Sequence, residues 1–381
     1  MRRLLKLLLL VAVALALAAG LVKYRYGGGA DFPDRSTAAR LHASALEIVT
    51  ELDDPPGNIA VSSHGRVFVS LHPWARPEMA VVEIVDGHPT PFPDQSFLDC
   101  NVEPNCFRQV LGIRIDRQNR LWTLDTGKHG WYPPRLLAFD LNSGLQVHAF
   151  EFGPNIAPRG SHLNDLQVSA DGLHVIIADA SILRQRPALI VYDVLGQTAR
   201  RVLENHPALG AEKFTPVVQR RRMELFGLFS IRPGVGSIAL DRDGQWLYLA
   251  PPTNLQLYRL RLSDLLDPSM QATALAGRVQ SYAAKTMSAG ISTDDQGRIY
   301  LTDFEHSAIT MLSSDRALET LIQDATQLRW PNGLSFGPDG DLYVTASALH
   351  QVLGRSDDHI RAKAPFAVLR LKAPGRAHPG H

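Results

Sequence analysis

GIRIDRQNRLWTLD, from Gly112 to Asp125, consists of a short apolar segment, a polar turn and a second apolar segment. The same pattern occurs six times, and in each copy the Gly or Asn of the turn stands seven places after the first residue. The copies begin at Asn58, Gly112, Asp165, Ser237, Gly290 and Gly333. Alternation of period two on both sides of such a turn is typical of a β-hairpin, because the turn residue needs a positive φ. Each copy is therefore predicted to be one hairpin.

The spacing of the copies predicts the architecture. Successive copies begin 54, 53, 72, 53 and 43 residues apart, which leaves room for four strands in each interval. Six four-stranded units in one chain predict an all-β fold, a six-bladed β-propeller. We expect the apolar stretches 45–52 and 366–372 to pair and close the ring, because an open ring leaves unpaired strand edges.

Segments outside the hairpins complete the domain plan. The first 30 residues are assigned to an N-terminal segment and 40–372 to the propeller. An insertion at about 195–235 is too apolar for a disordered linker, so we expect it to pack over one face and to be partly helical. A mobile loop is the alternative. Residues 373–381 are expected to form a flexible tail.

The N-terminal segment has the layout of an export signal. Arg2, Arg3 and Lys6 precede an uncharged run over 7–22. Hydrophobicity alone does not separate cleavage of this run from its retention as a short anchor. The protein is therefore expected to be exported, and to be secreted, periplasmic or attached to the membrane by its N-terminus.

Only two cysteines occur, Cys100 and Cys106. Export to an oxidising compartment favours a disulfide between them, with a pair of free thiols as the alternative. A zinc site is disfavoured because two Cys without neighbouring His supply too few ligands.

The charge balance limits the partners. The chain has 39 basic and 38 acidic residues and a formal net charge of +1, so no global field attracts nucleic acid. We expect a small-molecule ligand, no nucleic-acid partner, membrane contact only through an uncleaved N-terminal segment, and a monomer.

Several of these strings occur together in a known family. RLWTLDTG, HLNDLQVSADGLHVIIADAS, GSIALDRDGQWLYLAP and WPNGLSFGPDGDLYV resemble the yellow/major royal jelly protein family in the form found in bacterial relatives. The resemblance runs from about Gly57 to Val352 in the order of the family's motifs. It implies a secreted six-bladed propeller but not one reaction. Some members resemble carriers of biogenic amines in the central channel, some have been linked to dopachrome conversion, and many have no assigned activity.

Polar residues flank the hairpins at the end opposite their turns. They stand just before a first strand or just after a second strand, and both ends of a hairpin lie opposite its turn. We therefore expect them to share one mouth of the channel and to bind the ligand there. The candidates are Asn58, Asp125, Asn164, Asp165, Asp179, Asp303 and Asn332. The alternative is that each braces a loop by accepting hydrogen bonds from backbone amides.

A metal site is a further alternative. Oxygen-rich groups suit a divalent cation such as Ca²⁺, and a more distant similarity to gluconolactonase/senescence-marker propellers implies a divalent metal in the channel. Asn164 and Asn332 match the ligand positions of those propellers. The other corresponding positions hold Gly57, Leu111, Gly236 and Ala289, which offer no ligating side chain. No cofactor is otherwise assigned.

The sequence contains no nucleophile elbow, phosphate loop or dinucleotide fingerprint. His162, beside Asn164, is the best candidate for a general base. Aromatic residues in or beside loops could stack on a ligand, namely Trp74, Trp131, Tyr132 and Trp330.

Three functions therefore stay open. We favour binding of a small molecule, amine, aromatic or sugar-like, at the mouth of the channel. A metal-assisted lactonase-like hydrolase or a dopachrome tautomerase-like enzyme is the first alternative, and a protein-interaction platform is the second. An apolar, aromatic-lined cavity with one or two acids would favour binding, whereas several convergent oxygen ligands would favour a metal enzyme.

Overall fold

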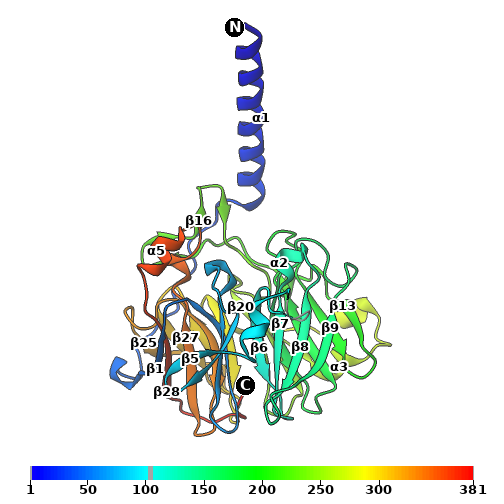
Figure 1. Ribbon diagram of the computed structural model, residues 1–381, viewed down its shortest axis with the longest axis vertical. Coiled ribbons are helices and arrows are strands. Elements are labelled where there is room, and N and C mark those ends of the chain that lie inside the picture. Colours follow the sequence, from blue (N-terminus) through cyan, green and yellow to red (C-terminus); the bar gives the residue numbers. More distant parts are fainter. Residues whose placement is uncertain (1, 102–105, 381) are drawn as a thin grey trace.

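The computed structural model describes residues 2–101 and 106–380. Within these residues, six four-stranded antiparallel sheets stand around one axis as the blades of a propeller (Figure 1). The first strands of neighbouring blades contact each other around the whole ring. The prediction of an all-β six-bladed propeller is confirmed.

The blades follow one another along the chain. The strands of the first three blades are β2 (Pro56–Val61), β3 (Val67–Leu71), β4 (Val81–Val85), β5 (His88–Pro91), β6 (Val110–Ile115), β7 (Arg120–Asp125), β8 (Arg135–Asp140), β9 (Gln146–Glu151), β10 (Leu163–Val168), β11 (His174–Asp179), β12 (Ala188–Asp193) and β13 (Thr198–Val202). The strands of the next two blades are β18 (Ser237–Leu240), β19 (Trp246–Ala250), β20 (Gln256–Arg261), β21 (Gln280–Ala284), β22 (Ser288–Thr293), β23 (Ile299–Asp303), β24 (Ala308–Leu312) and β25 (Leu318–Gln323).

The last blade joins the two ends of the chain. It consists of β26 (Pro331–Phe336), β27 (Asp341–Ala346), β28 (Phe366–Lys372) and β1 (Glu47–Leu52), in the order β1-β28-β27-β26. β1 pairs antiparallel with β28, with Leu52 opposite Phe366. The expected closure of the ring is confirmed, because the N-terminal strand β1 completes the last blade.

The inner hairpins turn where the sequence repeat places their Gly or Asn. Asn119 has a φ of 60° and Gly172 a φ of 72°, which is the left-handed region that these turns require. The opposite ends of the same hairpins pair at positions such as Leu163 with Asp179 and Ser288 with Asp303. All first strands therefore begin at one end of the channel, and all these turns lie at the other.

The core lies between the blades. β6 and β27 are buried at every position, because each inner strand is covered by a neighbouring blade on both faces. Trp122 is fully buried between two blades, and its indole Nε1 donates to Asp116 Oδ2 at 2.7 Å. This double-sided burial explains why the repeats read as nearly continuous apolar runs.

Short helices occupy the connections between strands. They are α2 (Gly127–Gly130), α3 (Leu262–Leu266), α4 (Ala272–Ala276) and α5 (Asp357–Arg361), with the 3₁₀ turns η1 (Ala43–Ala45), η2 (Pro73–Ala75), η3 (Gln95–Leu98), η4 (Pro207–Leu209) and η5 (Leu349–Gln351).

The insertion differs from the expected outline. Residues 198–202 belong to β13, which pairs with β12 and completes the third blade, so the extra segment begins after Val202. It contains η4 and two small hairpins, β14 (Val217–Val218) with β15 (Arg221–Arg222), and β16 (Glu224–Leu225) with β17 (Phe229–Ser230). Figure 1 shows β16 on the face of the propeller from which the N-terminal helix rises.

The C-terminal residues pack where we expected a flexible tail. The Gly380 amide donates to the Phe336 carbonyl at 3.1 Å, and the Asp295 amide donates to the Arg376 carbonyl at 2.7 Å. Arg114 Nη1 donates to the Gly380 carbonyl at 3.3 Å. The tail is held because it returns across the hairpin turns to unpaired backbone groups and to a buried arginine.

The N-terminal helix α1 (Arg2–Tyr26) has no buried residue and is long and apolar enough to cross a membrane. These properties are those of a signal sequence or an anchor. Cys100 and Cys106 form a disulfide with a Cα–Cα distance of 4.9 Å, so the predicted bond is confirmed.

Candidate functional site

A cavity of about 90 Å³ lies at the end of the channel where the first strands begin. This volume holds several water molecules or part of a small molecule. Apolar side chains make most of its wall: Trp74, Leu111, Ile182, Ile231, Phe304, Trp330, Leu334 and Leu349. Its polar side chains include Asn58, His72, Arg114, His162, Asn164, Asp165 and Asn332.

Four of the seven predicted ligand residues line this cavity. They are Asn58, Asn164, Asp165 and Asn332, and the general-base candidate His162 lines it too. They meet because β2, β10 and β26 begin at the same end of the ring. Hairpin register alone was enough to place these residues together.

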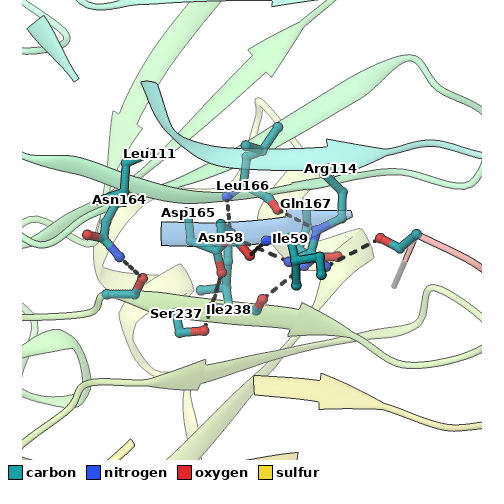
Figure 2. Close-up of polar contacts among 12 residues, drawn as sticks. Asn58, Ile59, Leu111, Arg114, Asn164, Asp165, Leu166, Gln167, Ser237 and Ile238 are labelled. Atoms are coloured by element: carbon teal, nitrogen blue, oxygen red, sulfur yellow. Dashed lines mark hydrogen bonds and ion pairs between the residues drawn. The ribbon is translucent and has the colours of Figure 1, made fainter. Parts of the chain in front are cut away.

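Asp165 is the centre of a polar network in the cavity floor (Figure 2). Its Oδ1 accepts from Asn58 Nδ2 at 3.3 Å, Arg114 Nη2 at 3.4 Å and the Leu166 amide at 2.9 Å. Its Oδ2 accepts from the Ser237 hydroxyl at 3.3 Å and the Ile238 amide at 3.1 Å. Burial raises the pKa of the Asp165 carboxyl, and Arg114 and these hydrogen bonds oppose the shift. Hydrogen-bond donors of the protein thus occupy both oxygens of the carboxylate.

The three asparagines differ in how they are held. Asn58 Oδ1 accepts from the Ile59 amide at 2.8 Å, and the Asn164 amide donates to the Gly236 carbonyl. Within the described part of the chain, the side-chain amide of Asn332 has no hydrogen-bond partner. Asn332 is therefore the cavity amide that is available to a ligand.

One wall is built from imidazole and indole rings. Trp74 lies 5.1 Å from His72 and stacks on His162 at 6.1 Å between ring centroids, and His162 stacks on His129 at 4.8 Å. Burial lowers the pKa of His72 to about 3 and lowers that of His162 well below its ordinary value. Both rings are neutral at neutral pH, so this wall presents flat uncharged faces.

A second aromatic stack contains Trp330. Its ring stacks on Phe304 at 4.5 Å and on His350 at 6.4 Å. Among the described residues, neither Trp330 Nε1 nor His162 Nδ1 has a hydrogen-bond partner, although both atoms are buried. Buried polar atoms without partners are uncommon and costly, and both residues line the cavity.

Three predicted ligand residues lie outside the cavity lining, namely Asp125, Asp179 and Asp303. Asp125 accepts from the amides of Arg108 at 2.8 Å and Gly127 at 3.1 Å. Asp179 accepts from the amides of His162 at 2.7 Å and Ser181 at 2.8 Å and pairs with Arg201 at 2.8 Å.

Asp303 accepts from the amide and the Nδ1 of His306, the latter at 2.9 Å. This carboxylate raises the pKa of His306 to about 9. All three acids stand at the ends of second strands, one layer outside the first strands, and each accepts hydrogen bonds from backbone amides of the loops at that end. These contacts match the alternative interpretation of the sequence, in which such acids brace loops.

The cavity donors do not fit a divalent cation. Among residues 2–101 and 106–380, no group of three or more His, Cys, Asp or Glu is arranged to hold a metal ion. Asn164 and Asn332 line the same cavity, but its one carboxylate is paired with Arg114 and its Asn58 carbonyl is bound to a backbone amide. Ca²⁺ needs six to eight oxygen ligands, and these residues do not supply them.

Some cavity residues have no signal in the repeat pattern. Pro216, Ile231 and Pro233 come from the insertion and cover the cavity. Arg114 was missed although a single charge in the middle of an inner strand, GIRI, is a signal of a buried polar network. Of the aromatic candidates, Trp74 and Trp330 line the cavity, whereas Trp131 and Tyr132 are exposed.

Solved structures with a similar fold are enzymes of several kinds. A luciferin-regenerating enzyme superposes with a TM-score of 0.56 and 11% identity, covering 88% of this chain and 97% of that one. A gluconolactonase from Xanthomonas campestris gives a TM-score of 0.52 and 15% identity, covering 91% and 97%. At these identities the likeness shows the propeller fold alone.

The sequence comparisons are more specific. Major royal jelly protein 6 of Apis mellifera is 27% identical over 191 residues, a match that covers 46% of this chain and 40% of that protein. The sequence profile of the major royal jelly protein family matches residues 109–373, which is more than half of the chain. The resemblance seen in the repeat motifs is confirmed, and this chain belongs to the major royal jelly protein family.

Proposed function

We propose that this protein binds a small molecule with a flat aromatic body in the cavity at the end of its channel. The observation that carries the proposal is the composition of the wall, which two aromatic stacks and one unpaired amide share. Flat rings favour stacking on indole and imidazole faces, and one amide can orient a polar substituent. We propose the protein as exported, on the basis of α1 and the disulfide.

Charge distinguishes among the ligand classes. The Asp165 carboxylate is the acid of the cavity, and it is paired with Arg114. An ammonium group would meet no free counter-charge there, and a sugar would leave most of its hydroxyls against apolar walls. The proposal therefore places neutral aromatics ahead of amines and sugars. Indole should bind at least as tightly as tryptamine, and methyl glucoside more weakly than either.

The Asn332→Ala variant tests the amide. It should weaken indole-3-carboxamide binding about tenfold, or about 1.4 kcal/mol, because a buried polar group of the ligand loses its partner. Isothermal titration calorimetry measures the affinity, and circular dichroism measures the melting temperature, which should stay unchanged. Asn155→Ala, in an exposed loop outside the cavity, is the matched control. Equal affinities for the two variants would remove Asn332 from the site.

One observation favours a second candidate, a proton-transferring enzyme of the tautomerase class. His162 is neutral, buried and in the cavity wall, with Nδ1 unpartnered among the described residues. A neutral imidazole can accept a proton from a bound substrate. Turnover of dopachrome by the wild type that His162→Gln abolishes, with indole binding retained, would establish this activity. Absence of turnover would leave the binding function alone.

A further inference from the structure

The chain contacts the propeller directly from the last residue of α1 onward. Tyr26 stacks on Phe229 with ring centroids 4.9 Å apart, and its hydroxyl donates to the Leu183 carbonyl at 2.9 Å. Arg232 Nη2 donates to the Tyr26 carbonyl at 2.7 Å. The last residue of α1 is thus bound to two separate loops of the body.

The next residues continue this attachment along the insertion. The Gly28 amide donates to Glu224 Oε1 at 2.9 Å. The Ala30 amide donates to the Lys213 carbonyl at 3.0 Å, and the Thr215 amide donates to the Ala30 carbonyl at 2.9 Å. No flexible spacer therefore separates α1 from the propeller, and Figure 1 shows the helix standing upright on one face. If α1 spans a bilayer, this face lies at the bilayer surface.

Large apolar side chains are exposed on the same face. Phe226, at the tip of the β16–β17 hairpin at the base of α1, is 90% exposed, and Trp131, directly after α2, is 67% exposed. Tyr132 is 49% exposed, and Leu183, whose carbonyl binds Tyr26, is 42% exposed. Aromatic rings with this placement are enriched at the level of lipid headgroups.

Cations accompany these rings. The Arg159 guanidinium lies 5.2 Å from the Trp131 ring, and Arg108 lies 5.2 Å from the Tyr132 ring. Lys23 and Arg25 occupy the last turn of α1. The nearby acids Asp31 and Glu224 are engaged, the first with Arg222 at 2.6 Å and the second with the Gly28 amide. Basic groups beside exposed aromatics suit the surface of a membrane with anionic lipids.

We propose that this face is a membrane-docking surface, with α1 retained in the bilayer and Phe226, Trp131 and Tyr132 set among the lipid headgroups. The proposal replaces the expectation that only the N-terminal segment touches the membrane. It also orients the cavity, because Pro216, Ile231 and Pro233 of the insertion both line the cavity and belong to the segment that carries Phe226. A ligand would then enter from the membrane side, a consequence that rests on the proposed function, whereas the docking surface does not.

The test uses the full chain with one added thiol, since the two native cysteines are joined. Phe226→Cys carries a polarity-sensitive fluorophore on the docking face. The control is Leu195→Cys, at a residue that is 76% exposed in the turn between β12 and β13. The adjacent Val194 amide donates to the Leu173 carbonyl beside the Gly172 turn, so Leu195 lies at the end of the propeller that carries the hairpin turns. Both positions are exposed, so neither change should affect folding.

In vesicles of phosphatidylethanolamine and phosphatidylglycerol, the label at 226 should be quenched by aqueous iodide about fivefold less than the label at 195, because headgroups shield it. In a small excess of a nonionic detergent, which solvates α1 alone, both labels should stay accessible to iodide. Equal quenching of the two labels in vesicles would overturn the proposal. The proposal would also be overturned if protection of the label at 226 did not depend on lipid content but rose with protein concentration. That result would indicate a second copy of the chain on this face.

Recovery of the exported protein without α1 in the soluble fraction would also overturn it. Indole binding measured in detergent is independent of all these outcomes, so failure of the docking surface is distinguishable from failure of the proposed function.

Discussion

Replacing Arg114 with Met should lower the free energy of unfolding by about 3 kcal/mol at pH 7, because it leaves a buried carboxylate without its cationic partner. Arg114 and Asp165 are each 4% exposed, and their charged groups lie 3.4 Å apart. Met preserves most of the side-chain volume, so the loss reports charge and hydrogen bonding rather than a cavity. The variant also frees the Gly380 carbonyl, which Arg114 binds.

The pH dependence of this loss identifies its cause. Burial raises the pKa of Asp165 in the folded protein, and removal of Arg114 should raise it further. A carboxyl whose folded pKa exceeds its unfolded pKa favours folding most at low pH, and this contribution is lost as the pH rises toward the folded pKa. The difference between wild type and Arg114→Met should therefore be smaller at pH 5 than at pH 7.

Urea unfolding at both pH values measures this difference. The double variant Arg114→Met with Asp165→Asn should recover most of the lost stability, because no unpaired charge remains. A deficit that is independent of pH and is not recovered by the double variant would mean that Arg114 acts through packing alone.

Asp303→Asn is expected to lower the melting temperature while ligand binding per folded molecule stays unchanged. Asp303 is fully buried, lies outside the cavity lining and is hydrogen-bonded to the amide and ring of His306. Its carboxylate raises the pKa of His306 to about 9, whereas the ordinary value is about 6.5. The substitution should therefore bring the His306 pKa back toward that value.

The sign of the resulting pH effect follows from linkage. A histidine with a raised folded pKa contributes stability that is fully present below about pH 6.5 and is lost as the pH rises through about 9. His306 is partly exposed, with 27% of its side chain accessible, so solvent screening limits the contribution to about 1 kcal/mol. The wild type should lose this amount relative to Asp303→Asn between pH 6 and pH 10. Weaker indole binding by a variant with an unchanged melting temperature would instead make Asp303 a ligand residue.

The fold could be predicted because each hairpin has a local sequence pattern. The turn residues Gly65, Asn119 and Gly172 recur in fixed register, and positive φ restricts what can stand there. The insertion could not be outlined in the same way. Thr198–Val202 pairs with β12 through backbone bonds that leave little trace in its polar sequence, TARRV, so β13 was placed in the insertion.

The candidate site was only partly predictable. Register placed Asn58, Asn164 and Asn332 at one mouth, but it cannot show whether a carboxylate at a strand end faces the channel or its own loop. Asp179 and Asp303 instead accept hydrogen bonds from backbone amides at that end of their blades, those of His162 and His306 respectively. The cover of the cavity comes from segments without periodicity, whose positions depend on tertiary packing.

Filling the cavity tests the central claim that this space is the ligand site. Gly236 lines the cavity, and a Cβ there would meet Asn164 Nδ2 at 3.4 Å and Pro252 Cγ at 3.5 Å, which are ordinary contacts with two other lining residues. Gly236→Leu should therefore occupy the cavity without straining the backbone. Gly153→Leu is the matched control, since a Cβ at Gly153 meets nothing within 4 Å.

The measurement is the affinity of indole for the wild type and both variants by isothermal titration calorimetry, with melting temperatures recorded alongside. We expect that Gly236→Leu, still folded, loses at least about tenfold in affinity, while Gly153→Leu binds as the wild type does. A folded Gly236→Leu protein that binds indole with wild-type affinity would show that the ligand site lies elsewhere.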